Sequence, residues 1–366
     1  MNVPDDDRSR HLKQVLRRSS ALRSGCTMDF GGPTGTIAAM TDETVLDDLD
    51  RRIVAALQTH GRATWQQVGR AAGTSDTTAA RRAQRLFASG LVRVVASTDP
   101  LRSVGGYPVL IQVTCRVGQA PRVAAELAAR PDVRFAALIT GTFDLIVELI
   151  VPSQRALARV LFEEIEQVDG ILSTVTETVI AQHKVANVWA HGTLAPEAVA
   201  TLEAERGTVE QRDPKPLDER DNALVGLLAE DARLSFAELA VRLDMSESMV
   251  KRRLDTLTRD GRVRYTTIVR PELLGYGVEV FYWLAVDLRH LDQTTKALAE
   301  RPEVRYLSST AGYSDLTCEV VLRHQDDLLA FNTRVLGELP GIRRVEIGLE
   351  LITVKRAFTL VEGGDL

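Results

Sequence analysis

Two segments of the sequence combine short hydroxyl side chains with arginines at a spacing that suits DNA binding. In each segment a serine precedes a helical pattern, and basic residues follow about one helical turn later. Hydroxyls and a helix N-terminus can bind phosphate, and arginine can contact phosphate or the edge of guanine in the major groove. The candidate DNA-binding residues are Ser75, Thr77, Thr78, Arg81, Arg82 and Arg85 in the first segment, and Ser246, Ser248, Lys251, Arg252 and Arg253 in the second.

The local charge differs between these two segments. Residues 50–95 contain eight arginines and two acidic residues, a balance of 8 − 2 = +6 in a chain whose formal net charge is −5. Residues 221–266 contain eight basic and eight acidic residues, so their balance is zero. We therefore expect the first segment to supply more of the salt-dependent contact with phosphate. Whether the second segment binds DNA is left open.

A second pair of segments could bind an anion through exposed backbone N–H groups. The stretch RPDVRFAALITGTFD starts at Arg130, and RPEVRYLSSTAGYSD starts at Arg301. In each, proline stops a helix, a strand follows, and Gly-x-x-Asp connects that strand to the next. Glycine permits positive φ and exposes N–H groups, while aspartate can cap the turn. The pattern fits either a hairpin turn or a loop that receives a ligand's carboxylate.

Residues typical of catalysis are sparse. The six histidines do not coincide when the two halves are aligned, and no Ser/His/Asp set, metal-ligand spacing or phosphate-binding glycine loop is evident. We expect no catalytic residues, no metal and no cofactor, with His183 as the one histidine to watch. Three scattered cysteines indicate a cytoplasmic setting, and no apolar run approaches the ~18 residues of a membrane span.

These candidate residues belong to a long internal repeat. The two Arg-Pro stretches are separated by 301 − 130 = 171 residues, and the same shift aligns Leu46 with Leu217 and Gly170 with Gly341 without a gap. The expected organisation is a disordered extension (1–44), a helix-turn-helix domain (45–98), a small α/β domain (105–190), a linker (191–215), a second helix-turn-helix domain (216–270) and a second α/β domain (276–360). A short helix is expected in the linker from Pro196 to Glu205.

The predicted fold class is α+β. Each copy has three helical patterns, then an extended segment, then the order β-α-β-β-α-β typical of a ferredoxin-like domain. Strands such as the one that contains Leu145 and Val147 are apolar in both phases, so each sheet needs a cover on both faces, and the other copy can provide one. We use Val147 as the test position for this packing. The extended segments near Val94 and Thr267 are expected to pair.

The chain resembles the Lrp/AsnC (feast/famine) transcriptional regulators. The motifs that carry the resemblance are Leu-Asp-x-x-Asp, Ala-Arg-Leu-Ser before a helix, Met-Ser-Glu-Ser followed by Lys-Arg-Arg-Leu, and Gly-x-x-Asp in each α/β domain. The resemblance implies winged-helix-like DNA-binding domains, ferredoxin-like effector domains called RAM, double-stranded DNA and an amino-acid-like effector as partners, and homo-oligomers. It also implies the effector-loop positions Thr140, Gly141, Asp144, Thr310, Gly312 and Asp315.

Three features depart from the family pattern, the first being the fusion of two copies into one chain, and two other functions stay open. Asp244 stands where the first copy has Gly73, which is expected to weaken or re-aim the second DNA-binding helix. The residues inside the two loops also differ, Thr142-Phe143 against Tyr313-Ser314, so two unlike pockets are possible. The alternatives are a tetrapyrrole decarboxylase of the siroheme type built on the same plan, and a metabolite sensor in which one half has lost DNA binding.

Overall fold

The computed structural model describes residues 46–98, 106–185, 192–210 and 215–361. The expected disordered extension, residues 1–44, lies outside these ranges. The fold is mixed α/β, and its elements repeat at the expected offset: strand β1 begins at Val92 and strand β6 at Val263, and 263 − 92 = 171. Within the described ranges, no helix has both the length and the apolar character needed to cross a membrane.

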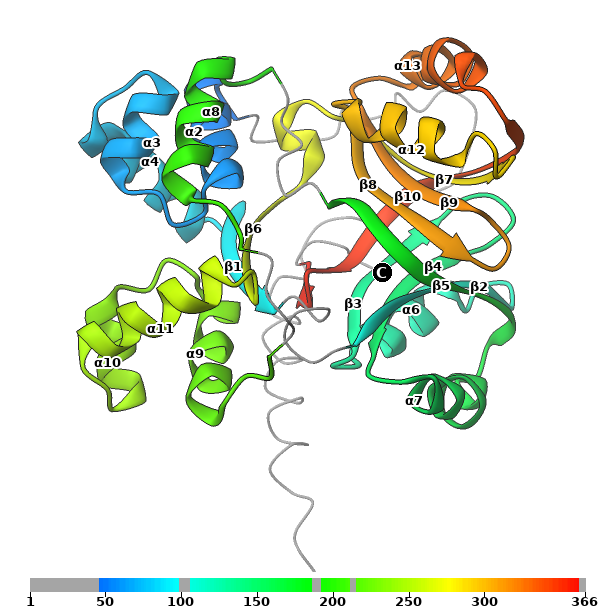
Figure 1. Ribbon diagram of the computed structural model, residues 1–366, viewed down its shortest axis with the longest axis horizontal. Helices are drawn as coiled ribbons and strands as arrows, with labels where there is room; N and C mark the ends of the chain where they lie inside the picture. The colour runs from blue at the N-terminus through cyan, green and yellow to red at the C-terminus, as the bar shows by residue number, and fades with distance from the viewer. Residues whose placement is uncertain (1–45, 99–105, 186–191, 211–214, 362–366) are drawn as a thin grey trace, which may run out of the picture. The chain divides into compact units, whose positions relative to one another are not determined.

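Each copy begins with three short helices (Figure 1). They are α2 (Asp48–Thr59), α3 (Trp65–Ala72) and α4 (Asp76–Ala88) in copy one, and α9 (Glu219–Glu230), α10 (Phe236–Leu243) and α11 (Glu247–Arg259) in copy two. The serines expected before helices act as caps: Ser75, Ser235 and Ser246 each accept a hydrogen bond from the backbone N–H three residues later, and Thr64 does the same for α3. The apolar faces of the helices form one buried core in each copy.

Asp244 does not change the turn between the second and third helices. It ends α10 in the left-handed conformation with φ 50° and ψ 52°, and Gly73 ends α3 with φ 70° and ψ 40°. Aspartate is one of the residues that tolerate this conformation. The backbone therefore takes the same path in both copies, and the expectation that Asp244 re-aims the following helix is wrong at the level of the turn.

Each copy continues with a β-α-β-β-α-β unit. Copy one has β2 (Tyr107–Cys115), α6 (Ala120–Ala128), β3 (Val133–Ile139), β4 (Leu145–Val151), α7 (Gln154–Arg159) and β5 (Ile171–Val185). Copy two has β7 (Val278–Val286), α12 (Leu291–Glu300), β8 (Val304–Ala311), β9 (Leu316–Leu322), α13 (Gln325–Ala330) and β10 (Ile342–Arg356), followed by the short β11 (Thr359–Leu360). The helices α7 and α13 each continue through one wide π-helical turn and a 3-10 turn.

The two sheets join edge to edge into a closed ring of antiparallel strands. The order within copy one is β3-β4-β2-β5, and β5 then pairs with β8 of copy two. The ring closes because β10 pairs with both β7 and β3. The long fourth strand of each copy therefore hydrogen-bonds to its own sheet and to the other copy. Edge pairing of this kind was not part of the sequence prediction.

The inner faces of the two sheets also pack on each other, as expected. Their shared core includes Phe135 and Ile146 from copy one and Phe281 and Trp283 from copy two, with 5.7 Å between the ring centres of Phe135 and Phe281. Helices α6 and α7 cover the other face of the copy-one sheet, where Val147 is buried. Val147 is therefore the wrong test position for packing between the copies, and its neighbour Ile146 is the right one.

A two-stranded ribbon and the linker helix complete the described fold. Strands β1 (Val92–Thr98) and β6 (Val263–Val269) pair antiparallel, with Val94 opposite Thr267, as predicted (Figure 1). The linker forms helix α8 (Pro196–Arg206), which confirms the short helix expected there. Leu202 on α8 is fully buried in the core of the first three helices.

Candidate nucleic-acid interface and effector loops

The N-termini of α4 and α11 present the predicted hydroxyls to solvent. Ser75 and Thr77 are exposed and Thr78 is half-buried, and the Thr78 backbone N–H donates to the Ser75 hydroxyl oxygen at 3.2 Å. Ser246 and Ser248 occupy the same places at the start of α11 and are also exposed. The two N-termini therefore offer exposed hydroxyls and helix N–H groups, the combination that binds phosphate.

The predicted basic residues fall into two groups. Arg81, Lys251 and Arg252 are exposed, and no described acidic group forms an ion pair with them. Arg85 is also exposed but binds the Asp50 carboxylate at 2.5 Å. The exposed cations project from the sides of α4 and α11 that face away from the buried stripes, Ala79-Ala83-Leu86 and Val250-Leu254-Leu257.

Arg82 and Arg253 instead fold back onto the first helix of their own domain. Arg82 pairs with Asp47 and lies 3.1 Å from Asp50, whose carboxylate is buried. Arg253 repeats this in copy two, at 2.8 Å from Asp218 and 2.6 Å from Asp221. The hydrogen bonds raise the pKa of both arginines. These two predicted DNA contacts therefore already have a role in holding the third helix against the first.

The two helix-turn-helix units hold each other through a reciprocal pair of arginines. Arg62 donates to the carbonyl oxygens of Ala232 and, at 3.1 Å, Leu234. Arg233, its equivalent at the 171 offset, donates to the carbonyls of Gly61 at 3.0 Å and Ala63 at 2.7 Å. Burial, together with the nearby Arg62, lowers the pKa of Arg233 to about 10, so it stays charged at neutral pH. Both arginines align in the sequence, but their shared role was not predicted.

Each of these arginines also lies over an aromatic ring of the other unit. The Arg233 guanidinium carbon is 4.2 Å from the centre of the Trp65 ring, and that of Arg62 is 5.1 Å from the Phe236 ring. Cation–π contacts and hydrogen bonds to carbonyls both weaken if the units separate. Together with the β1–β6 ribbon, they fix α4 and α11 as a pair with local two-fold symmetry.

The Gly-x-x-Asp loops form tight turns whose aspartates bind the protein's own backbone. Asp144 accepts a hydrogen bond from the Cys115 N–H at 2.7 Å, and Asp315 accepts one from the Val286 N–H at 2.7 Å. Gly141 has φ +111° and Gly312 has φ +156°, values that side chains rarely adopt. The two aspartates thus serve the hairpin, which is the simpler of the two interpretations.

Both loops lie against the last strand of the other copy. A Cβ atom on Gly141 would be 2.9 Å from the Ile347 carbonyl oxygen on β10. Thr140 accepts a hydrogen bond from the Leu349 N–H on β10 at 3.0 Å, and Thr310 on β8 pairs with Val179 on β5 of copy one. The structure therefore brings the six predicted effector-loop residues to the two junctions between the copies.

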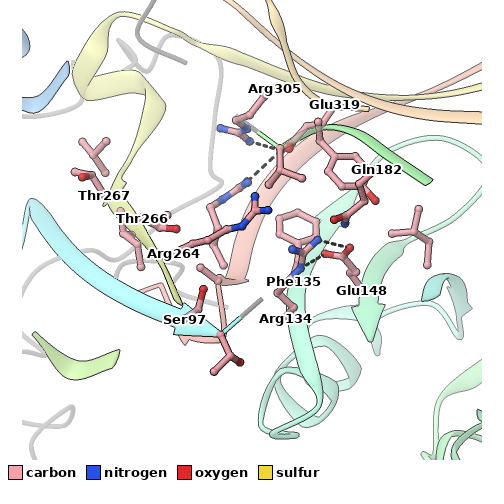
Figure 2. Close-up of a pocket in the computed structure, with 18 of the residues that line it drawn as sticks. Ser97, Arg134, Phe135, Glu148, Gln182, Arg264, Thr266, Thr267, Arg305 and Glu319 are labelled. Carbon is pink, nitrogen blue, oxygen red and sulfur yellow. Dashed lines mark hydrogen bonds and ion pairs between the residues drawn. The ribbon is translucent and has the colours of Figure 1, made fainter. Parts of the chain in front are cut away.

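A cavity of about 130 Å³ lies between the β1–β6 ribbon and the ring of strands (Figure 2). The ribbon contributes Ser97, Arg264, Thr266 and Thr267, and both copies contribute an arginine–glutamate pair. Arg134 binds Glu148 with its Nε at 2.7 Å, and Arg305 binds Glu319 at the equivalent place. This cavity is lined by both the sheets and the β1–β6 ribbon, and the ribbon joins the two helical units. No sequence motif marked it.

The copy-two side of this cavity carries a denser ionic cluster. The carboxylates of Glu279, Glu319 and Glu350 lie within 4.8 Å of one another, and Arg305 and Arg356 form ion pairs with all three. Burial and then the neighbouring Glu279 raise the pKa of Glu350 to about 8. Burial opposes the ionisation of Glu319 too, but the two arginines lower its pKa to about 2. The guanidinium groups supply the positive charge that a metal would otherwise provide.

Two histidines bear on the enzymatic alternative. His183 hydrogen-bonds to the Ser309 hydroxyl at 2.8 Å, at the β5–β8 junction. His60 lines a larger groove of about 1100 Å³ between the two helical units and α8, together with Arg206, Arg259 and Lys184. Burial lowers the pKa of His60, so it is neutral near pH 7. This groove, and not the His183 region, combines a histidine with several cations.

Comparison with known proteins places these features in a family. An AsnC-type helix-turn-helix domain matches residues 46–86, a winged helix-turn-helix DNA-binding model matches 217–264, and the Lrp/AsnC ligand binding domain matches twice, at 108–189 and 279–360. A transcriptional regulator of the HTH type from Pyrococcus abyssi is 32% identical over 141 residues, 38% of this chain and 89% of the relative. The regulator LrpA from Pyrococcus horikoshii is 28% identical over 130 residues, 35% of this chain and 92% of the relative.

Solved structures of a siroheme decarboxylase are similar over most of the chain. The siroheme decarboxylase NirDL aligns with a TM-score of 0.56 at 15% identity, covering 86% of this chain and 94% of that one. At this identity the likeness concerns the fold alone, and it extends over both copies. The domain matches and the regulator relatives, together with the exposed helices and the repeated α/β units, show that this chain belongs to the Lrp/AsnC family of regulators.

Proposed function

We propose that the chain is a sequence-specific DNA-binding transcriptional regulator in which two complete modules are fused. In this proposal residues 45–98 and 216–270 are winged-helix-like DNA-binding domains, residues 105–190 and 276–360 are ferredoxin-like RAM domains, and residues 191–215 link the modules. The extents of the repeated elements support these boundaries.

The observation that carries this function is the reciprocal contact between Arg62 and Arg233. It pairs the helices α4 and α11 while their hydroxyls and the side chains of Arg81 and Arg252 stay exposed. Two recognition helices related by a two-fold axis suit two half-sites about one helical turn of DNA apart. We propose that Arg82 and Arg253 contribute less to DNA binding, since each binds the first helix of its own domain.

The proposed effector sites are the two Gly-x-x-Asp loops, with Thr140, Gly141 and Asp144 in copy one and Thr310, Gly312 and Asp315 in copy two. Their position at both junctions between the copies supports this assignment, because a ligand there would act on the contact between the copies. The effector class is an amino acid or a related small metabolite. Homo-oligomers are part of the proposal, and the exposed apolar residues Val117 and Leu288, equivalent at the 171 offset, offer a surface for them.

The proposed function is tested by mapping bound DNA across the genome and by footprinting one strong site. We expect two protected half-sites spaced by about one turn of the duplex. Protection of a single half-site by the intact chain, or no sequence preference at all, would overturn the proposal. Repeating the mapping with candidate amino acids tests the effector part separately.

Under the regulator proposal, the chain is not an enzyme. The second candidate function is tetrapyrrole decarboxylation. The groove that contains His60, Arg206 and Arg259 is the specific feature that keeps the alternative in view, alongside the fold shared with NirDL. Similar proteins are named transcriptional regulators, which favours the DNA-binding function. A stable tetrapyrrole absorbance after incubation with the protein, lost in His60→Ala, would favour the second.

A further inference from the structure

The two junctions between the copies are built from opposite kinds of side chain. At the copy-two loop the buried residues are polar, and at the copy-one loop their equivalents at the 171 offset are apolar or have no side chain. The equivalent pairs are Glu177 and Gly348, Gln112 and Trp283, Ser314 and Phe143, Thr317 and Ile146, and Thr310 and Ile139. Five positions therefore differ together, which indicates that each set serves one local purpose.

At the copy-two loop the polar residues surround the carboxylate of Glu177 from β5. One oxygen accepts hydrogen bonds from the Ser314 N–H at 2.6 Å and the Ser314 hydroxyl at 2.7 Å. The other accepts from the Gln112 side-chain amide at 3.2 Å and the Thr317 hydroxyl at 3.4 Å. The side chain is fully buried, and none of these four donors is a cation. Neutral donors converging on one buried carboxylate form a binding site for that group.

At the copy-one loop the same place is filled with apolar groups. Phe143 and Trp283 pack edge to face with 6.1 Å between ring centres, and Ile146 joins them in the core between the sheets. A Cβ atom on Gly348 would lie 3.2 Å from the Trp283 ring, so a side chain would be crowded where copy one has its glutamate. The Trp283 indole N–H is the one polar group among these side chains, against four donors at the other loop.

We propose that the copy-two loop is a carboxylate-binding site and that the chain fills it with its own Glu177. The loop N–H groups freed by Gly312 are suited to a ligand's carboxylate, and Glu177 delivers one from the other copy as a tethered ligand. The copy-one loop lacks these polar side chains. A free carboxylate effector therefore has to displace Glu177 to bind at the copy-two loop of the wild-type chain. Only this last consequence, the competition with a free effector, rests on the proposed effector role of the loops.

Chemical rescue of the full-length Glu177→Ala variant tests the proposal. The substitution removes a CH₂–COO⁻ fragment, and acetate has nearly the same size and charge. We expect the melting temperature of E177A in chloride to fall by on the order of 5 °C, because four buried donors lose their acceptor. Sodium acetate at matched ionic strength should recover at least half of this loss, whereas wild type should melt at the same temperature in both salts.

Two controls make the rescue specific to the carboxylate and to the loop. Acetamide, the neutral counterpart of acetate, should recover much less. The double variant E177A/S314A lacks a close donor and should regain less stability in acetate than E177A does. Equal melting temperatures of E177A in acetate, acetamide and chloride would overturn the proposal.

Refolding provides the same test if E177A does not fold in chloride. Recovery of the native circular dichroism spectrum only in acetate supports a carboxylate site, and no recovery in either salt contradicts it. DNA binding by the wild type is measured independently. If acetate fails to rescue E177A while the wild type binds DNA, the tethered-ligand proposal alone is contradicted. If the wild type does not bind DNA, the proposed function is contradicted.

Discussion

Arg233 of the second helix-turn-helix unit lies 4.2 Å over the ring of Trp65 in the first, and Arg62 returns the contact over Phe236. Each arginine also binds two carbonyls of the other unit. A duplicated sequence thus forms, within one chain, the symmetric arrangement that separate subunits would otherwise provide. The contact joins equivalent residues of the 171-residue repeat and thereby pairs the two helices proposed to bind DNA.

Replacing Arg233 with alanine should uncouple the helical units. The Gly61 and Ala63 carbonyls lose their donor and Trp65 loses its cation, so we expect the free energy of unfolding to fall by about 2–3 kcal/mol. Urea denaturation followed by circular dichroism measures this. Arg242→Ala, which removes an exposed arginine from α10, is the matched control and should cost less than about 0.5 kcal/mol. Equal stability of the two variants would contradict the reciprocal contact.

Arg81 and Arg82 are neighbours with different predicted roles. Arg82→Ala should lower the free energy of unfolding by about 1–2 kcal/mol, because Arg85 is then the one ion-pair partner of the buried Asp50 among the described residues. Arg81→Ala should leave stability within about 0.5 kcal/mol of wild type and lower DNA affinity instead. Denaturation and DNA titration of both variants separate these effects. A loss of DNA affinity without a loss of stability in Arg82→Ala would indicate that Arg82 contacts DNA.

Glu350 should make stability depend on pH between about pH 4.5 and pH 8. Its pKa is raised from 4.5 to about 8 by burial and by Glu279. A group with a raised pKa stabilises the fold fully below its unfolded-state pKa, and that stabilisation is lost as the pH rises through the folded-state pKa. The free energy of unfolding should therefore fall by on the order of 1 kcal/mol per pH unit on approaching pH 8 and level off above it. Glu350→Gln should flatten this slope, and an unchanged slope in that variant would show that another group is responsible.

Thr317→Ile places the copy-one residue in the copy-two junction. The substitution removes a donor to Glu177 and adds volume beside it, so the free energy of unfolding should fall by about 1–3 kcal/mol. The reverse change, Ile146→Thr, puts an unpaired hydroxyl in the core between the sheets and should cost a similar amount. If either swap is neutral by urea denaturation, the two junctions are less specialised than their contacts indicate.

Much of the fold follows from local sequence, because caps, prolines and apolar spacing act over a few residues. Ser75 and Ser246 were identified as caps, and the pairing of Val94 with Thr267 was anticipated from two extended segments at one offset. The face that Val147 occupies could not be assigned in this way. Its strand is apolar in both phases, and only tertiary packing distinguishes the helix side from the inter-sheet side.

The candidate sites show the same division. The exposed Arg81 and Arg252 follow from helical spacing, but the return of Arg82 and Arg253 to acidic partners depends on the angle between helices. Glu177 and Gly348 are aligned by the repeat and differ visibly. Their meaning requires knowing that each copy's last strand crosses to the other copy's loop, which the sequence does not encode locally.

The most direct test of the paired DNA-binding helices is the salt dependence of DNA binding by Arg81→Ala, Arg252→Ala and the double variant. Fluorescence anisotropy on DNA from upstream of the chain's own gene measures affinity and its slope against salt concentration. We predict that each single variant weakens binding at least about tenfold, that each lowers the slope by roughly one unit, and that Arg81→Ala has the larger effect. Affinity and slope unchanged from wild type in the double variant would contradict DNA binding by α4 and α11.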